Sequence, residues 1–242
     1  MCAGSRYTRY MHQYFDPDHW DRLMTDPLWY MGELYDTYLT LMDQAEHDDQ
    51  NRHAIKYAIR SYFAERLRQG RVALADSGPD ADAERKPVDT VVIHHTSGAA
   101  ALYASLDYLD AVQLLRIYVP AHRADPVRAG KPLWSGHMYK GRQVFWGYHW
   151  FIFEDGRAER ILPDTAIGRH SGNWDTNTRS IGICLAGNFM HQPPNEAMLQ
   201  TLQRIIREQY GSSDMHIIGH RDVRDTTCPG DTFDAWKPHL GP

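Results

Sequence analysis

Val91-Val-Ile-His-His-Thr96 is a short run of β-branched residues that leads directly into two histidines and a threonine. β-branched residues favour strands, and a short run that is wholly apolar is typical of a strand buried on both faces. Open α/β sheets build their sites at the ends of such strands, where the strand holds the backbone and the next loop supplies the side chain. We therefore expect the segment to be a core strand with a functional side chain at its end.

The sequence around this strand continues as a mixed α/β pattern. The polar turn Glu154-Asp-Gly-Arg157 lies between two strand patterns and predicts a hairpin. Strand patterns cover Tyr148–Phe153, Ala158–Leu162, Ser180–Ala186 and Met215–Ile218, and helical spacing covers Ala99–Tyr118 and Asn195–Tyr210. We predict an α/β domain over residues 89–242, with a central mixed β-sheet flanked by helices. Within it, residues 119–146 contain several prolines and glycines and are predicted to be an inserted loop.

The N-terminal part of the chain has a different pattern. Thr25-Asp-Pro27 is a typical helix start, and apolar residues at helical spacing follow it. A second apolar stripe covers Ile55–Leu67 before Gly70, and a shorter segment covers Trp20–Met24. We therefore predict an N-terminal α-helical appendage over residues 1–74, joined by a polar linker over 75–88. Its apolar stripe is expected to be core packing, and the helices are a candidate surface for a protein partner or self-association.

Composition excludes several classes of protein. The chain has 242 residues, of which 42% are hydrophobic, and its net charge of −5 argues against nucleic-acid binding. It contains no apolar run near the roughly 20 residues of a membrane-spanning helix. Its first residues lack the apolar core of a signal peptide, so we expect synthesis in the cytoplasm. Cys2, Cys184 and Cys228 are too few and too scattered for a disulfide framework.

Three metal-ligand side chains are predicted at or beyond strand ends. His94 follows the first strand, His220 follows the last strand, and Cys228 lies eight residues beyond His220. Two imidazoles and a thiolate suit Zn²⁺, and three protein ligands leave a fourth position for water, as in catalytic zinc sites. The spacing alone does not identify a metal site, since a single histidine after a strand is more often a packed or solvated residue.

Residues 90–240 resemble the zinc-dependent type 2 N-acetylmuramoyl-L-alanine amidases, which share a fold with the peptidoglycan recognition proteins. The similarity lies in four segments that occur in the family's order. They are Val91-Val-Ile-His-His-Thr96, Gly147-Tyr-His-Trp-Phe-Ile152, Ile167-Gly-Arg-His-Ser-Gly172 with Asn177-Thr-Arg-Ser-Ile-Gly-Ile183, and Gly219-His-Arg-Asp-Val-Arg-Asp-Thr-Thr-Cys-Pro-Gly230. The resemblance implies one zinc ion per chain, held by His94, His220 and Cys228.

The resemblance also implies catalytic and substrate-binding residues. Tyr148 and Thr226 would donate hydrogen bonds to the developing oxyanion, and no carboxylate is assigned as general base. His170 corresponds to a histidine beside the family's substrate cleft. Trp174 would line the groove, and Asn177 is carried as a substrate contact, with ordering of its loop as the alternative. Of the remaining candidates, His95 and His149 point to the other face of their strands, and Cys184 is expected in the core.

By this resemblance we expect an amide hydrolase that cuts between the lactyl group of N-acetylmuramic acid and L-alanine. The substrate would be peptidoglycan, met after release from the cell or through a dedicated export route, as by an endolysin or a toxin, or a cytoplasmic muropeptide. One alternative is a recognition module that binds muropeptide without cutting it, although such modules usually lack the cysteine that Cys228 supplies here. Another is a structural zinc or metal-free domain that binds a protein through its N-terminal helices. The interval from His94 to Tyr148 is longer than is usual in the family, and the recycling enzymes use aspartate in place of Cys228.

Overall fold

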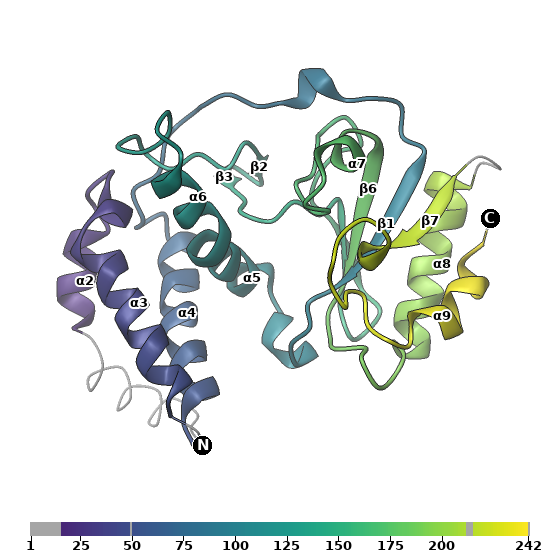
Figure 1. The fold of residues 1–242 in the computed structure, drawn as a ribbon, viewed down its shortest axis with the longest axis horizontal. Coiled ribbons are helices and arrows are strands. Elements are labelled where there is room, and N and C mark those ends of the chain that lie inside the picture. The colour runs from purple at the N-terminus through teal and green to yellow at the C-terminus, as the bar shows by residue number, and fades with distance from the viewer. Residues whose placement is uncertain (1–15, 49, 212–214, 242) are drawn as a thin grey trace. The chain divides into compact units, whose positions relative to one another are not determined.

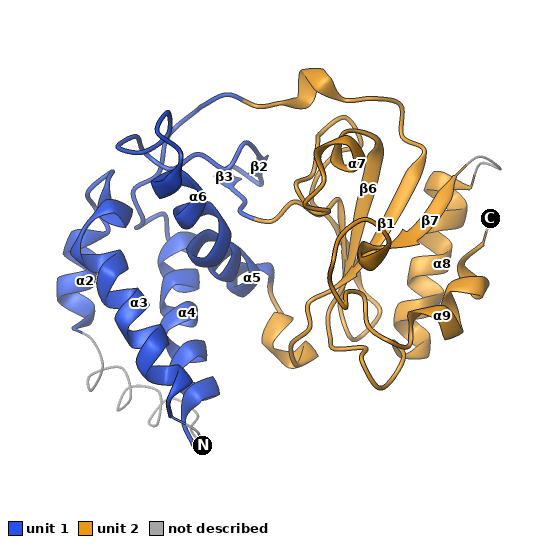
Figure 2. Ribbon diagram, in the orientation of Figure 1, with its two compact units in different colours: residues 1–79, 106–145 blue, residues 80–105, 146–242 orange. Residues whose placement is uncertain are grey.

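The computed structural model describes residues 16–48, 50–211 and 215–241, and Cys2 lies outside them. The chain divides into two compact units (Figure 2). Unit 1 comprises residues 1–79 and 106–145, and unit 2 comprises residues 80–105 and 146–242. The division differs from the sequence-based one, because residues 106–145 cluster with the N-terminal helices. Among the described residues, no helix is both long enough and apolar enough to cross a membrane.

Helices make up most of unit 1. Asp16 caps the first helix by accepting hydrogen bonds from the N–H groups of Asp18 and His19. The first three helices are α2 (Pro17–Leu23), α3 (Glu33–Glu46) and α4 (Arg52–Arg68). The helix start predicted at Thr25-Asp-Pro27 is wrong: a 3₁₀ turn covers Trp29–Met31, and α3 begins only after Gly32, whose backbone is extended. Glycine is unfavourable in a helix interior, so α3 does not extend back through Gly32.

The loop prediction for residues 119–146 is only partly right. Helix α5 (Leu106–Gln113) continues through a π-helical turn over Leu114–Tyr118 into α6 (Val119–Ala124). Pro120 lies in the first turn of α6 and has no N–H to donate, and the Leu115 carbonyl one turn earlier accepts from the Tyr35 hydroxyl at 2.9 Å instead. Beyond α6, β2 (Met138–Tyr139) and β3 (Arg142–Gln143) form a small antiparallel hairpin.

Unit 1 has a core rich in aromatic side chains. Phe63 packs edge-on against Trp20, and Tyr118 packs edge-on against Phe145. Residues from both segments of the unit share this core, including Trp20, Trp29, Tyr30, Tyr35, Tyr38, Tyr62, Phe63, Leu114, Leu115 and Phe145. Full burial of a large apolar side chain contributes about 2 kcal/mol or more to folding stability. This shared core therefore holds residues 106–145 against the N-terminal helices.

Unit 2 contains a five-stranded mixed sheet in the order β5-β4-β6-β1-β7. Its strands are β1 (Thr90–His95), β4 (Trp150–Ile152), β5 (Ala158–Arg160), β6 (Ser180–Leu185) and β7 (His216–Gly219). Strands β4, β6, β1 and β7 are parallel, and β5 pairs antiparallel with β4. Figure 1 shows β6, β1 and β7 side by side. The predicted mixed sheet is therefore confirmed.

Three helices accompany this sheet: α7 (Trp174–Arg179), α8 (Glu196–Tyr210) and α9 (Phe233–Trp236). Asn195 caps α8 by accepting from the N–H of Met198, as the predicted amphipathic helix requires. The end of α8 is tied to β4, because the Trp150 indole N–H donates to the Tyr210 hydroxyl at 2.9 Å. Short α7 leads directly into β6, which places its polar residues at the amino end of the sheet's central strand.

Candidate metal centre

The structure brings His94, His220 and Cys228 together. His94 is on β1, His220 follows β7, and Cys228 lies in the loop beyond. One ligand atom from each of the three lies within 4.8 Å of the others. Because β1 and β7 are adjacent and parallel, both histidines reach the same edge of the sheet. Among the described residues, this is the group whose spacing would hold a metal ion.

Backbone hydrogen bonds hold the two C-terminal ligands in place. Asp222 accepts from the Gly219 N–H at 2.8 Å and so closes the 3₁₀ turn that carries His220. The Arg221 N–H donates to the Cys228 carbonyl at 2.8 Å, joining the two ligand-bearing segments. The N–H of His95 points to the Cys228 sulfur at 3.4 Å, which is the type of bond that stabilises a thiolate.

The protonation states suit a metal. Burial and the neighbouring histidines hold the pKa of His94 well below its usual range, and burial also lowers the pKa of His220. Both rings are therefore neutral, which is the form that ligates metals. Burial raises the pKa of the Cys228 thiol to about 11, so a cation would be needed to keep it as a thiolate. Two imidazoles and one sulfur fit Zn²⁺ with an open fourth position.

The two predicted oxyanion donors lie beside this centre. The Tyr148 ring is 5.1 Å from the His94 ring, centroid to centroid. Burial and the neighbouring Cys184 raise the pKa of the Tyr148 phenol well above its ordinary value, so the group stays protonated, with Cys184 as its hydrogen-bond partner. The Thr226 hydroxyl accepts from the Cys228 N–H at 3.3 Å, which leaves the hydroxyl hydrogen available to a ligand.

The three predicted substrate contacts differ in exposure. Trp174 is 39% exposed, its indole N–H donates to Glu84, and the Arg169 guanidinium lies 5.4 Å from its ring centroid. His170 is only 7% exposed and Asn177 only 4%. Side chains so deeply buried do not present themselves to a polymer in solution. The exposure expected of a substrate contact is therefore found at Trp174 and missing at His170 and Asn177.

The remaining histidines next to the site have structural partners. His149 accepts from the Gly182 N–H at 3.0 Å and donates to the Ala166 carbonyl at 3.1 Å. His95 Nδ1 accepts from the Phe189 N–H, so its ring is engaged away from the ligand group. Cys184 is fully buried within β6, as expected.

Two residues that the sequence did not single out contact His220 and His170. The Ser171 carbonyl lies 2.9 Å from His220 Nε2, and the Ser180 hydroxyl lies 3.2 Å from His170 Nε2. A backbone carbonyl carries no side-chain signal, so the Ser171 contact could not be read from sequence. Ser180 did have a signal, because it begins the central strand within the segment that also holds Asn177.

A mixed sheet with two imidazoles and a thiol at its edge defines a candidate zinc-site α/β protein. The sequence profile of the N-acetylmuramoyl-L-alanine amidase family, Amidase_2, matches residues 84–231. The chain belongs to this type 2 amidase family, which includes the peptidoglycan recognition proteins. The family assignment predicted from the four sequence segments is confirmed.

The chain is also similar to individual relatives and solved structures. Peptidoglycan recognition protein 1 of Bos taurus is 28% identical over 155 residues, which cover 61% of this chain and 69% of the relative. Peptidoglycan recognition protein 1 of Rattus norvegicus is also 28% identical over 155 residues, covering 61% and 72%. Among solved structures, the N-acetylmuramoyl-L-alanine amidase LysC from Clostridium intestinale is 24% identical with a TM-score of 0.49, covering 70% of this chain and 94% of that one.

Proposed function

We propose that this protein is a zinc-dependent amidase that hydrolyses the amide between the lactyl group of N-acetylmuramic acid and L-alanine of the stem peptide. The observation that carries the proposal is the group formed by His94, His220 and Cys228, whose ligand atoms lie within 4.8 Å of one another. Family membership supplies the substrate class, since the family acts on or binds peptidoglycan. Cys228 favours hydrolysis over binding alone, because it completes the ligand set.

The residues have distinct tasks in this proposal. His94, His220 and Cys228 would hold one zinc ion per chain, which supplies Lewis-acid polarisation of the scissile carbonyl and a water whose pKa is lowered to about 7. Tyr148 donates a hydrogen bond where negative charge develops on the carbonyl oxygen, and Thr226 provides a second donor. One well-placed donor of this kind contributes about 3 to 4 kcal/mol to the transition state. Trp174 offers an exposed aromatic surface for the glycan or peptide.

The test is digestion of intact sacculi and soluble muropeptides in parallel, with mass spectrometry of the products. Zinc-loaded protein is expected to release a free stem peptide beginning with L-alanine and a glycan with a free lactyl carboxylate. Comparison of the two substrates shows whether the enzyme acts on the wall or on fragments. Binding of muropeptide without any release of peptide would instead establish a recognition module, and the hydrolase proposal would be dropped.

A further inference from the structure

One dipeptide, His170-Ser171, reaches both histidines of the metal centre. The Ser171 carbonyl lies 2.9 Å from His220 Nε2. Because a carbonyl oxygen only accepts, His220 Nε2 carries the hydrogen and its Nδ1 keeps the lone pair. His94 has the same arrangement, since its Nε2 lies 3.0 Å from His170 Nδ1 while its own Nδ1 faces the Cys228 sulfur at 3.8 Å. In both ligands the dipeptide thus engages Nε2 and leaves Nδ1 for a metal.

The ring of His170 is itself held in one orientation. Its Nε2 lies 3.2 Å from the Ser180 hydroxyl, so an Nε2–H that donates to Ser180 leaves Nδ1 as the acceptor for His94. The ring packs directly over Gly182, where an added Cβ would lie 2.6 Å from the His170 Cγ. The absence of a side chain at position 182 therefore makes room for this ring on the central strand.

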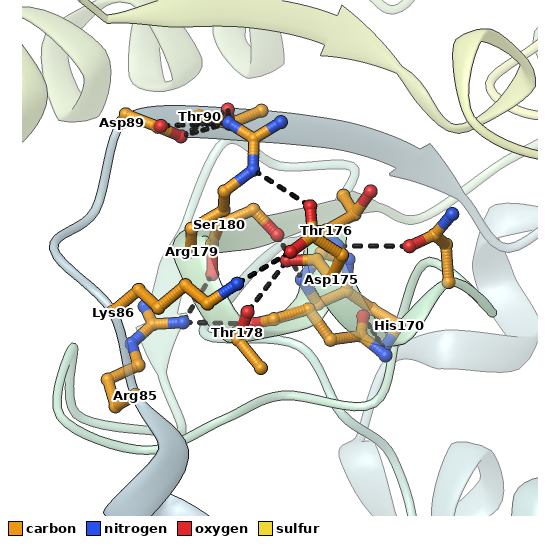
Figure 3. Close-up of polar contacts among 12 residues, drawn as sticks. Arg85, Lys86, Asp89, Thr90, His170, Asp175, Thr176, Thr178, Arg179 and Ser180 are labelled. Atoms are coloured by element: carbon orange, nitrogen blue, oxygen red, sulfur yellow. Dashed lines mark hydrogen bonds and ion pairs between the residues drawn. The ribbon is translucent and has the colours of Figure 1, made fainter.

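A single amide oxygen anchors the dipeptide. Asn177 Oδ1 accepts from the Ser171 N–H at 2.9 Å, from the Ser171 hydroxyl at 2.8 Å and from the His170 N–H at 3.3 Å. The Arg85 guanidinium in turn donates to the carbonyls of Asn177 and Ser180 at 2.9 and 3.0 Å. Figure 3 shows the Arg85 guanidinium pointing toward Thr178 and Ser180. Three donors converging on one buried oxygen leave the dipeptide little freedom to shift.

We propose that His170-Ser171 is a positioning dipeptide, which fixes the orientation and tautomer of both histidine ligands so that their Nδ1 atoms face the metal, and that Asn177 anchors it. The inference rests on the proposed zinc site. In place of the predicted substrate contacts, His170 contacts the ligand His94, and Asn177 holds the dipeptide. Partners of this kind orient ligating imidazoles and raise their basicity.

The first test measures zinc affinity by competition with a chromophoric chelator. Removal of such a partner typically costs about 10- to 100-fold in metal affinity, which is the loss expected for His170→Phe. His170→Asn places an amide oxygen near the position of Nδ1 and is expected to recover most of that affinity. Thr201→Val is the control: it removes a buried hydrogen-bonding group of unit 2, whose bond goes to the Gly156 carbonyl, and should leave zinc affinity unchanged.

Denaturation of the zinc-free proteins separates positioning from stability. If His170→Phe weakens zinc binding only because it destabilises the fold, a His170→Asn protein of the same stability should bind zinc equally weakly. That result would contradict the proposal. It falls equally if folded His170→Phe binds zinc as tightly as the wild type.

A second measurement needs no variant. Nitrogen-15 NMR of the wild-type rings is expected to show Nε2–H at His94 and His220, with zinc on Nδ1. Zinc on Nε2 of either ring, or an Nδ1–H tautomer without zinc, would overturn the positioning dipeptide even if hydrolysis is confirmed. Conversely, if the wild type bound no zinc but both rings were Nε2–H, the hydrolase proposal would fail and the positioning contacts would stand.

Discussion

Unit 1 and unit 2 both bury polar side chains, but these side chains meet different partners. In unit 1, Asp110 is 0% exposed and accepts from the Phe145 N–H at 2.7 Å and from Arg142 at 3.0 Å. Gln143 bridges the Ala75 carbonyl and the Ser135 N–H. In unit 2, by contrast, His170 and its neighbours converge on the two imidazoles beside Cys228. Burial alone therefore does not tell whether a polar side chain stabilises the fold or positions the metal site. Its hydrogen-bond partners do.

The contrast predicts separable effects. Substitutions at the buried polar groups of unit 1 should change the free energy of unfolding and leave zinc affinity alone. Substitutions at the metal centre should change zinc affinity or hydrolysis at constant fold.

Cys228→Ser removes the only sulfur among the three predicted ligands. We expect loss of tight zinc binding and a fall in amide hydrolysis of more than about 1000-fold, because several kcal/mol of charge stabilisation depend on the metal. Metal analysis of purified protein and product formation from muropeptides check this. Full hydrolysis by zinc-free Cys228→Ser would break the assignment of the site.

Tyr148→Phe removes the hydroxyl of a side chain whose ring lies 5.1 Å from the His94 ring. The loss of a single oxyanion donor costs about 100- to 1000-fold in kcat, while zinc affinity should remain that of the wild type. Steady-state kinetics and chelator competition on the same preparation measure the two quantities. A parallel fall in zinc affinity would show that Tyr148 supports the ligands rather than the reaction.

Asp110→Ala leaves the Phe145 N–H without its buried acceptor and Arg142 without one of its two carboxylate partners. A cost of about 2 to 3 kcal/mol in unfolding free energy is expected. Asp110→Asn keeps an acceptor for the N–H and should lose less. Urea denaturation provides the measurement, and unchanged stability in Asp110→Ala would contradict a structural role.

Trp174→Ala tests the exposed side of unit 2. Removing a partly exposed aromatic contact should raise KM for muropeptide by about fivefold, or close to 1 kcal/mol, with zinc affinity and stability unchanged. Kinetics over a range of muropeptide concentrations would show this. A wild-type KM would place the substrate elsewhere on the unit.

Much of unit 2 could be predicted from sequence because its central strands contain short apolar runs. Val91-Val-Ile93 and the run within β6 have little alternative to a buried sheet, and parallel pairing then brings His94 and the residue after β7 to one edge. Unit 1 was harder. The helical run from α5 into α6 passes Pro120, which pattern reading treats as a loop signal although a first-turn proline is tolerated.

The ligand residues of the candidate site could be predicted from the sequence, but their hydrogen-bond partners could not. His94, His220 and Cys228 are ligand-type residues after strands, and the family segments carry them. The partners of their rings were not predictable, because the Ser171 contact comes from a carbonyl and the His170 contact depends on a side-chain orientation that packing over Gly182 sets. For the same reason, the burial of His170 and Asn177 could be seen only in the folded chain.

The central claim is that His94, His220 and Cys228 form one zinc site with an open position. X-ray absorption at the zinc edge, on wild-type protein loaded with one equivalent, tests it most directly. The account predicts one sulfur at about 2.3 Å and nitrogen or oxygen neighbours at about 2.0 to 2.1 Å. In Cys228→Ser the sulfur contribution should vanish. A zinc environment without sulfur in the wild type, or no bound zinc at all, would contradict it.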